Sequence, residues 1–387
     1  MEEQNKTTKN FSKKNWTGYI FVLLIAVGTI GSILWPKRSY SPNENRFLQQ
    51  MPSFTITTVL NGEFESKYET YITDQFLLRD QWIAFKTNVE RLLQKKDING
   101  VYFAKDDYLI ERHEATEINK EQEQKNVERL AIFVENAVKL LGDDHVRVML
   151  VPTASEILTD KLPAFASGYD QLAVIEQVKD LISSEYVVDV TETLKNHKDE
   201  YIYYKTDHHW TSLGAYYAYV EWAKSMGIEP LSQEEYTITK GSDKFYGTIA
   251  SKVNVSVKPD DIYLYEKADH PSYEVEYNET ETTDTLFHYE SLETKDKYSV
   301  FLNGNNALVK ITTENKNGRK LLVIKDSFSH CFVPLLVDHF EEVYMVDFRY
   351  YKMGASTIIA KEGITDTLVL YNVINFVEDK NSLMFER

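Results

Sequence analysis

Four short apolar segments constrain the fold of this chain more than any other feature. They are rich in Val, Leu and Ile, and they alternate with segments of helical periodicity: VRVMLV at 146–151, KLLVI at 320–324, VYMVDF at 343–348 and TLVLY at 367–371. Continuous apolar runs of this length are typical of strands that are buried on both faces. Strands that alternate with helices predict βαβ units and a mostly parallel sheet covered on both sides, so the predicted fold class is α/β.

The helical segments show apolar residues at helical spacing together with residues that favour helix ends. Thr211 is a good N-cap, and Gly142 and Gly227 are good stop residues. A charged turn between two alternating stretches predicts a hairpin at 101–112. The expected helices cover about 64–70, 80–93, 117–141, 170–184, 212–226 and 328–339. The helix at 170–184 leads to YVVDV, where the alternation of helices and strands predicts another strand.

Residues 228–300 differ from this pattern. They contain many Thr, Glu, Asp and Tyr residues, short strand-like pieces and no long helical segment. We expect them to form a β-rich, partly irregular insertion in a large domain that covers 61–387.

One long uncharged apolar run, WTGYIFVLLIAVGTIGSILW, covers 16–35. Twenty helical residues rise about 30 Å, which matches the hydrocarbon core of a bilayer. A cleaved signal peptide has a shorter apolar stretch and a small-residue cleavage site, and ILWPKR at the end of this run offers no such site. We therefore expect a retained transmembrane anchor, with a signal peptide as the alternative.

The charges beside this run indicate its orientation. Four lysines and two glutamates lie in the tail 1–15, and Lys37 and Arg38 follow the run. This weak bias predicts a short cytoplasmic tail and a single-pass protein of the cell membrane whose main domain is extracytoplasmic. The Pro-containing residues 36–60 are expected to form a linker.

Composition limits the partners. The chain has 387 residues and a formal net charge of −17, which disfavours nucleic acid and anionic lipid headgroups because their phosphates would be repelled. Its single cysteine, Cys331, excludes an internal disulfide and a cysteine-based metal site. An uncharged or cationic partner, such as a glycan, is compatible with this charge.

Two polar segments carry the candidate chemistry. Ser327 follows KLLVI at a strand-to-helix junction, where free backbone N–H groups can stabilise an oxyanion. A serine hydroxyl needs a base, and DHHW can supply it, because Asp207 can orient His209 and stabilise its protonated form. His208 is expected to be a structural or substrate-facing neighbour. The competing interpretation of Ser327 is a simple N-cap, and Ser329 is its nearest rival as nucleophile.

Together these segments resemble a known family. TDHHWTSLGAYYAY resembles the Asp-x-His-Trp-Thr segment of the alginate O-acetyltransferase family and of its Gram-positive relatives, the DHHW proteins, and LLVIKDSFSHCFVPLL resembles their nucleophile segment. ENRFLQQMPSF, YITDQFLLRDQW and GTIASK are of the kind found there too. These proteins are similar to SGNH hydrolases with a permuted motif order, Asp and His before Ser. The resemblance therefore implies an SGNH-like αβα sandwich and an acetyl-transfer site of Ser327, His209 and Asp207.

The resemblance also implies an oxyanion hole made of the Ser backbone N–H, a Gly and an Asn. Asn372, directly after TLVLY, can be that Asn. No Gly follows VYMVDF, where Arg349 and Tyr350 stand instead. We treat these two residues as candidates for oxyanion or substrate contact. Trp210 is expected to lie in the core or to wall the pocket, with stacking on a sugar as an alternative.

Four functions remain open from the sequence. The first is an extracytoplasmic O-acetyltransferase that uses no cofactor and acetylates a polysaccharide of the cell wall or surface; the resemblance implies a multispanning membrane O-acyltransferase as its acetyl donor. The second is an esterase or deacetylase with the same residues. The third is a metal-dependent phosphoesterase, which DHH suggests, but no Asp-x-Asp completes its ligand set, so no metal is expected. The fourth is a non-catalytic glycan-binding protein.

Overall fold

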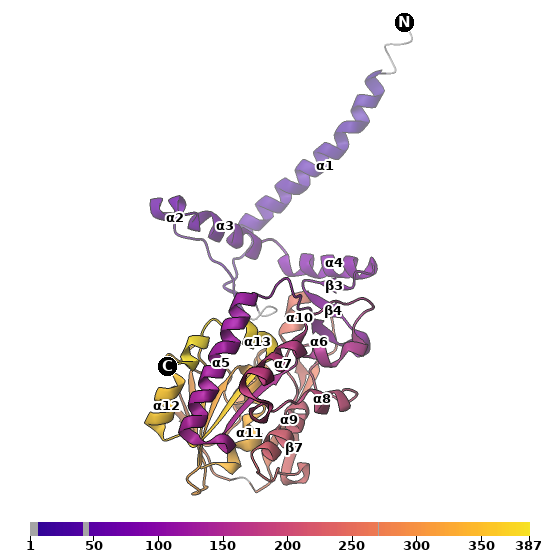
Figure 1. The fold of residues 1–387 in the computed structure, drawn as a ribbon. Helices are drawn as coiled ribbons and strands as arrows, with labels where there is room; N and C mark the ends of the chain where they lie inside the picture. Colours follow the sequence, from indigo (N-terminus) through magenta and orange to yellow (C-terminus); the bar gives the residue numbers. More distant parts are fainter. Residues whose placement is uncertain (1–6, 42–45, 270) are drawn as a thin grey trace. The chain divides into compact units, whose positions relative to one another are not determined.

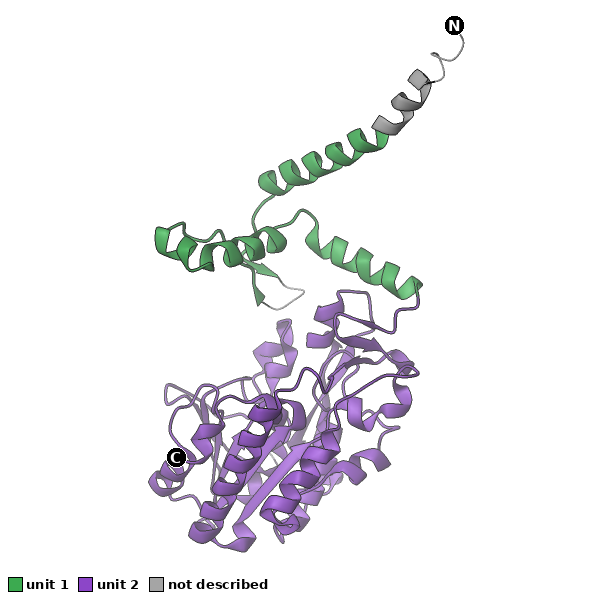
Figure 2. Cartoon of the chain, turned by 45° about the horizontal axis from the view of Figure 1, so that its top comes forward, with its two compact units in different colours: residues 1–93 green, residues 94–387 purple. Residues whose placement is uncertain are grey.

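The computed structural model describes residues 7–41, 46–269 and 271–387. The chain divides into two compact units, residues 1–93 and 94–387 (Figure 2). The start of the expected tail and residues 42–45 of the expected linker lie outside the described residues. Residues 61–93, which we had expected in the large domain, fall in the first unit, so their assignment to that domain stays a prediction.

The first unit contains the apolar run. Helix α1 includes Trp16–Leu34, a stretch with a mean hydropathy of 2.1 that is long enough to cross a membrane, a property that a signal sequence shares. The region expected as a linker contains two short strands and a short helix. The elements of this unit are α1 (Thr7–Leu34), β1 (Tyr40–Ser41), β2 (Arg46–Phe47), α2 (Ile56–Leu60), α3 (Glu63–Asp74) and α4 (Arg79–Leu92).

The second unit is the α/β domain, and its elements up to the insertion follow the predicted pattern (Figure 1). The hairpin at 101–112 is confirmed, since β4 and β5 pair antiparallel. Thr211 caps α9, and Gly142 ends α5, as predicted. The elements are β3 (Asp97–Ile98), β4 (Val101–Phe103), β5 (Leu109–Glu111), α5 (Lys120–Leu141), β6 (Val146–Val151), α6 (Ala154–Ile157), α7 (Gln171–Ile182), α8 (Thr191–Asn196) and α9 (Ser212–Ser225).

The insertion and the C-terminal part complete the domain. The described residues of the insertion are β-rich, as expected, with short helical turns and the α-helix α10, and the three predicted C-terminal strands are present. The elements are β7 (Tyr236–Phe245), α10 (Thr248–Val253), β8 (Asp260–Lys267), β9 (Glu274–Tyr277), β10 (Glu281–Thr283), β11 (Leu308–Thr312), β12 (Lys320–Lys325), the 3₁₀ helix η8 (Ser327–His330), α11 (Val333–Leu336), the 3₁₀ helix η9 (Val337–His339), β13 (Glu342–Val346), α12 (Ala355–Glu362), β14 (Asp366–Asn372) and α13 (Val373–Glu378).

The central sheet has the order β10-β9-β11-β13-β12-β14-β6. The pairs β13–β12, β12–β14 and β14–β6 are parallel, whereas β11 and the insertion strands β9 and β10 join antiparallel. The sheet is therefore mixed, and the prediction of a mostly parallel sheet needs this correction. The sequence did not reveal that the insertion extends the sheet, because edge strands with one polar face lack the continuous apolar signal.

Both faces of the sheet are covered. Along β12, Leu321 and Val323 pack into a core with α9 and α11, while Leu322 and Ile324 pack into a second core with α5, α7, α12 and α13. Successive strand residues point to opposite faces, so continuous apolar strands require helices on both sides. The predicted three-layer arrangement is thereby confirmed.

Two local predictions differ from the structure. The segment expected as one helix at 328–339 is broken into η8, α11 and η9. Pro334 has no N–H to donate to a preceding turn, which disfavours a continuous helix there. YVVDV does not form a strand and contributes a single parallel bridge, between Val187 and Val148.

A buried carboxylate from the insertion anchors the segment that leads into DHHW. Asp260, at the start of β8, is 2% exposed. It accepts hydrogen bonds from the Tyr201 hydroxyl (2.5 Å), the Lys205 N–H (2.8 Å), and the Thr206 N–H (2.7 Å) and hydroxyl (2.5 Å). The insertion thus fixes the backbone immediately before Asp207.

We predict that Asp260→Ala lowers the free energy of unfolding by about 3 kcal/mol, because it leaves several buried donors without an acceptor. Urea denaturation followed by tryptophan fluorescence measures this change. The matched control is Asp261→Ala, since Asp261 is 35% exposed and pairs with Lys240 at the surface. Its loss should cost less than about 1 kcal/mol. Equal effects of the two substitutions would contradict the anchoring role of Asp260.

Candidate active site

Ser327, His209 and Asp207 form a continuous hydrogen-bonded series. His209 Nε2 lies 2.7 Å from Ser327 Oγ, and His209 Nδ1 lies 2.5 Å from Asp207 Oδ1. The carboxylate can only accept, so the ring proton is on Nδ1 and the Ser327 hydroxyl donates to Nε2. All three residues are buried, with exposed fractions of 8%, 5% and 3%. The structure therefore brings together the three residues that the sequence predicts as catalytic.

The first turn of α10 holds the Asp207 carboxylate. Asp207 Oδ2 accepts from the Thr248 N–H (2.8 Å) and the Thr248 hydroxyl (3.0 Å), while Oδ1 also accepts from the His209 N–H (3.1 Å). Gly247 allows this approach, since a Cβ at this position would lie 2.2 Å from the Asp207 Cβ. The GTIASK segment thus supplies the support of Asp207, a role that the sequence did not reveal.

The protonation states suit a resting base. Burial alone raises the pKa of Asp207, but the adjacent His208 and His209 and the bonds from His209 and Thr248 outweigh it, so this pKa lies below its ordinary value. Burial, with a contribution from His208, lowers the pKa of His209 to about 4, against the opposing effect of Asp207. His209 is therefore neutral at neutral pH and can accept a proton.

Aromatic contacts hold the His209 ring in place. Tyr298 stacks on it with ring centroids 3.8 Å apart and an interplanar angle of 12°. The Tyr298 hydroxyl donates to the Ser327 carbonyl (3.1 Å), so one side chain contacts both the base and the nucleophile segment. Tyr298 lies in the insertion, and no feature of the sequence separates it from the chain's other tyrosines.

Trp210 connects the two motif segments. Its Nε1–H donates to the Phe328 carbonyl (2.8 Å), and its ring packs against Phe328 and Phe332. Trp210 has an exposed fraction of 0%, which agrees with the expected core position, and its stacking on a sugar stays a prediction without support from the geometry. Trp210 fixes the distance between His209 and Ser327 instead.

Asp326 organises the other side of the nucleophile. Its Oδ1 accepts from the Phe328 N–H (2.9 Å), which caps η8. Its Oδ2 accepts from the Asn372 N–H (3.0 Å), the Asn372 side-chain amide (2.7 Å) and the Asn375 side-chain amide (2.9 Å). One carboxylate therefore ties the end of β12 to the end of β14.

Two groups are available for an oxyanion next to Ser327. The Ser327 N–H lies at the start of η8, where backbone N–H groups have no intrahelical acceptor. Asn372 uses one amide hydrogen on Asp326 and accepts from the Asn375 N–H through its oxygen, so its second amide hydrogen remains. This arrangement agrees with the predicted placement of Asn372. Asn375, one helical turn further, was not predicted.

A small cleft opens beside these groups. Its wall is mainly apolar, with polar side chains from DHHW, the 101–112 hairpin and the helix after β14. The lining residues are Ile110, Glu111, His113, Thr153, Ala154, Ser155, His208, Ile249, Phe328, Asn372, Ile374 and Asn375. A small apolar cleft with few polar groups is the usual form of a ligand site.

Arg349 and Tyr350 do not line this cleft among the described residues. Arg349 is turned onto Asp347, with Nη2 2.6 Å from Oδ2 and Nε 2.9 Å from Oδ1. Tyr350 is 54% exposed on the same loop. Asp347 also faces the buried Lys325 at 3.4 Å. Arg349 therefore neutralises a buried carboxylate, and its expected role at the oxyanion stays a prediction without support from the geometry.

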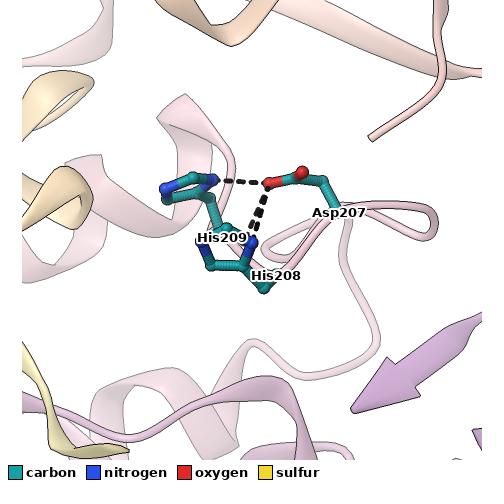
Figure 3. A group of neighbouring side chains, drawn as sticks. All are labelled: Asp207, His208 and His209. Atoms are coloured by element: carbon teal, nitrogen blue, oxygen red, sulfur yellow. Dashed lines mark hydrogen bonds and ion pairs between the residues drawn. The ribbon is translucent and has the colours of Figure 1, made fainter. Parts of the chain in front are cut away.

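Asp207, His208 and His209 also lie close enough to hold a cation, with ligand atoms within 4.8 Å of one another (Figure 3). A metal ion at this place would have to displace the hydrogen bond of His209 Nδ1 to Asp207. The same carboxylate already accepts from Thr248 and from the His209 backbone. The Asp207 carboxylate and His209 Nδ1, which a metal ion would need as ligands, are therefore already used in hydrogen bonds.

We predict that Gly247→Ala displaces Asp207 and suppresses the reactivity of Ser327, because the new Cβ overlaps the Asp207 side chain. Labelling of Ser327 by phenylmethanesulfonyl fluoride, followed by peptide mass analysis, measures this reactivity. Gly168→Ala is the control, since nothing lies within 4 Å of a Cβ at that position. Unchanged labelling of a folded Gly247→Ala variant would refute the dependence of Ser327 on Asp207.

Comparisons with solved structures agree with this architecture. A DHHW family protein from Eubacterium siraeum is 26% identical, with a TM-score of 0.61 over 75% of this chain and 96% of that chain. A structure of Bacillus cereus PatB1 with a sulfonyl adduct is 20% identical, with a TM-score of 0.61 over 75% of this chain and 98% of that chain. The O-acetyltransferase domain of Pseudomonas putida AlgJ is more distant, at 12% identity and a TM-score of 0.43 over 72% and 93%.

Sequence comparison identifies the family. None of the curated proteins that were compared is significantly similar to this chain. The sequence profile of the DHHW proteins matches residues 119–346, which include both motif segments, the insertion and most of the sheet. The chain belongs to the DHHW protein family.

Proposed function

We propose that this protein is a membrane-anchored serine O-acetyltransferase that acetylates hydroxyl groups of an extracytoplasmic cell-surface polysaccharide. The hydrogen-bonded series from Ser327 through His209 to Asp207 carries the proposal. Membership of the DHHW family and the resemblance of both motif segments to those of alginate O-acetyltransferases support acetyl transfer in particular. In this proposal the permuted order, Asp207 and His209 before Ser327, serves the same chemistry as in SGNH hydrolases.

The first step forms an acetyl-enzyme. His209 Nε2 removes the Ser327 hydroxyl proton while Oγ attacks the carbonyl carbon of an acetyl donor. Negative charge develops on the carbonyl oxygen, where the Ser327 N–H and the Asn372 amide are available as donors. The protonated His209, stabilised by Asp207, returns the proton to the leaving group. The product is an ester of acetate with Ser327.

The second step transfers the acetyl group. His209, neutral again, accepts the proton of an acceptor hydroxyl as its oxygen attacks the acetyl-Ser327 carbonyl. Collapse of the tetrahedral intermediate breaks the bond to Ser327 Oγ, which regains the proton from His209. A sugar hydroxyl as acceptor makes the protein a transferase, and water makes it an esterase, so the two activities share the intermediate.

The location of the protein decides its donor. In our proposal α1 is a retained anchor, the short tail is cytoplasmic and the second unit lies outside the membrane. Acetyl-CoA is cytoplasmic, so an acetyl group has to cross the membrane before it reaches Ser327. We infer that a multispanning membrane O-acyltransferase presents it.

We predict that Ser327→Ala abolishes acetyl-enzyme formation. The full chain, purified in detergent, is mixed with p-nitrophenyl acetate and quenched, and intact mass with peptide mapping locates the acetyl group. Asp207→Asn should slow acetylation about 10⁴-fold, because it favours the wrong tautomer of His209. Ser329→Ala is the control, since the Ser329 hydroxyl donates to the Asp326 carbonyl. Acetylation that persists in Ser327→Ala would overturn the proposal.

We predict an acidic limb near pH 4 in the rate of Ser327 acetylation. The pKa of His209 is lowered to about 4, so the neutral base persists from neutral pH down to that value and is lost by protonation below it. The rate constant should be flat above about pH 6 and half-maximal near pH 4. Rapid-quench mass analysis gives the rates, and circular dichroism at each pH controls for unfolding. A midpoint near about 6.5, the value of an unperturbed histidine, would contradict the assignment.

A further inference from the structure

The proposed mechanism assigns no role to His208, the first histidine of DHHW. His208 is partly exposed, with 29% of its side chain accessible, and it lines the cleft beside Ser327. Its ring lies against that of His209, with centroids 3.9 Å apart. Figure 3 shows that each of the two rings presents one nitrogen to Asp207 and the other to the side away from it.

The hydrogen bonds around Thr248 fix the tautomer of His208. The Thr248 hydroxyl donates to Asp207 Oδ2 (3.0 Å), so its oxygen can only accept from His208 Nδ1, which lies 2.8 Å away. In the neutral ring the proton is therefore on Nδ1, and Nε2 carries a lone pair. Within the described chain, Nε2 of His208 has no hydrogen-bond partner. Asp207 thus orients His209 directly and His208 through Thr248.

The cleft around His208 combines donors and acceptors. Glu111, Ser155 and Asn375 line it together with His208. Glu111 pairs with Lys252, and burial, which raises its pKa, is outweighed by neighbouring positive charge that includes Lys252, so it is a carboxylate. Such a set suits a molecule with several hydroxyl groups, since a hydroxyl can donate to one side chain and accept from another.

We propose that His208 Nε2 accepts a hydrogen bond from a second hydroxyl of the acceptor, adjacent to the one that reacts, so that the site selects vicinal diols. This inference rests on the proposed acetyl-Ser327 mechanism and names the acceptor class for it. The reacting hydroxyl gives its proton to His209 Nε2 and its oxygen forms the new ester bond. The neighbouring hydroxyl keeps its proton and is held by His208. The bond between acetyl and Ser327 Oγ breaks, and His209 returns the proton to Oγ.

The test is a competition between ethylene glycol, the simplest vicinal diol, and ethanol. The full chain in detergent turns over p-nitrophenyl acetate in an equimolar mixture of the two alcohols, and gas chromatography quantifies ethylene glycol monoacetate and ethyl acetate. His208→Asn keeps an amide donor near Thr248 but removes the Nε2 lone pair. We expect the ratio of glycol ester to ethyl ester to fall about two- to tenfold in this variant, the worth of one hydrogen bond.

Both esters form from the same acetyl-Ser327, so their ratio does not depend on how fast the first step proceeds in His208→Asn. His197→Asn is the matched control: His197 is also half-exposed and is bonded through Nδ1, to Glu200 at 2.7 Å, but lies outside the cleft lining. It should leave the ester ratio unchanged.

The outcomes separate this inference from the proposed function. An unchanged ester ratio in His208→Asn would overturn the role of His208. A wild-type protein that produces only acetate would also overturn the role of His208. If acetyl-Ser327 forms in that protein, the assignment of Ser327 as the nucleophile still stands. A wild-type protein that never acquires an acetyl group on Ser327 would overturn both proposals together.

Discussion

The buried carboxylate of Asp207 is the constraint on which the site depends. A buried charge is stable only when hydrogen bonds and opposite charge replace its lost hydration. The groups that satisfy Asp207 are the His209 ring and backbone and the first turn of α10 at Thr248. Satisfying the charge therefore orients the base, and Gly247 is required because no Cβ fits beside the carboxylate. The same hydrogen bonds that stabilise the buried Asp207 charge in the folded protein therefore also orient His209 as a base.

A second buried carboxylate does the same for the nucleophile. Asp326 gathers the amides of Asn372 and Asn375 and caps the turn that begins at Ser327. The two halves then meet through Trp210, whose indole donates to the nucleophile turn. Ser327 and His209 are 118 residues apart in the sequence, yet their side chains lie within one hydrogen bond. Rigid support of this kind keeps reacting groups within the narrow range that catalysis tolerates.

The fold was predictable where the sequence carries a strong local period. The four apolar strands and α5, α7 and α9 stand where periodicity and end residues placed them, because buried strands and amphipathic helices each leave a continuous signal. The mixed sheet was not predictable, since β9, β10 and β11 are short and partly polar and acquire their register only from neighbouring strands. The helix expected at 328–339 failed for a local reason, the proline in its middle.

For the site, the sequence by itself determined the chemical types and their order: Asp207 and His209 two residues apart, Ser327 at one strand end, and Asn372 at the end of the last predicted strand. Only the tertiary structure decided which groups support them, since nothing in the sequence indicated that Thr248 and Tyr298 of the insertion contact the site. In the tertiary structure Trp210 lies in the core, and the Arg349 side chain is hydrogen-bonded to Asp347. The physical reason is that residue type and spacing fix what a side chain can do, whereas burial and long-range hydrogen bonds fix what it does.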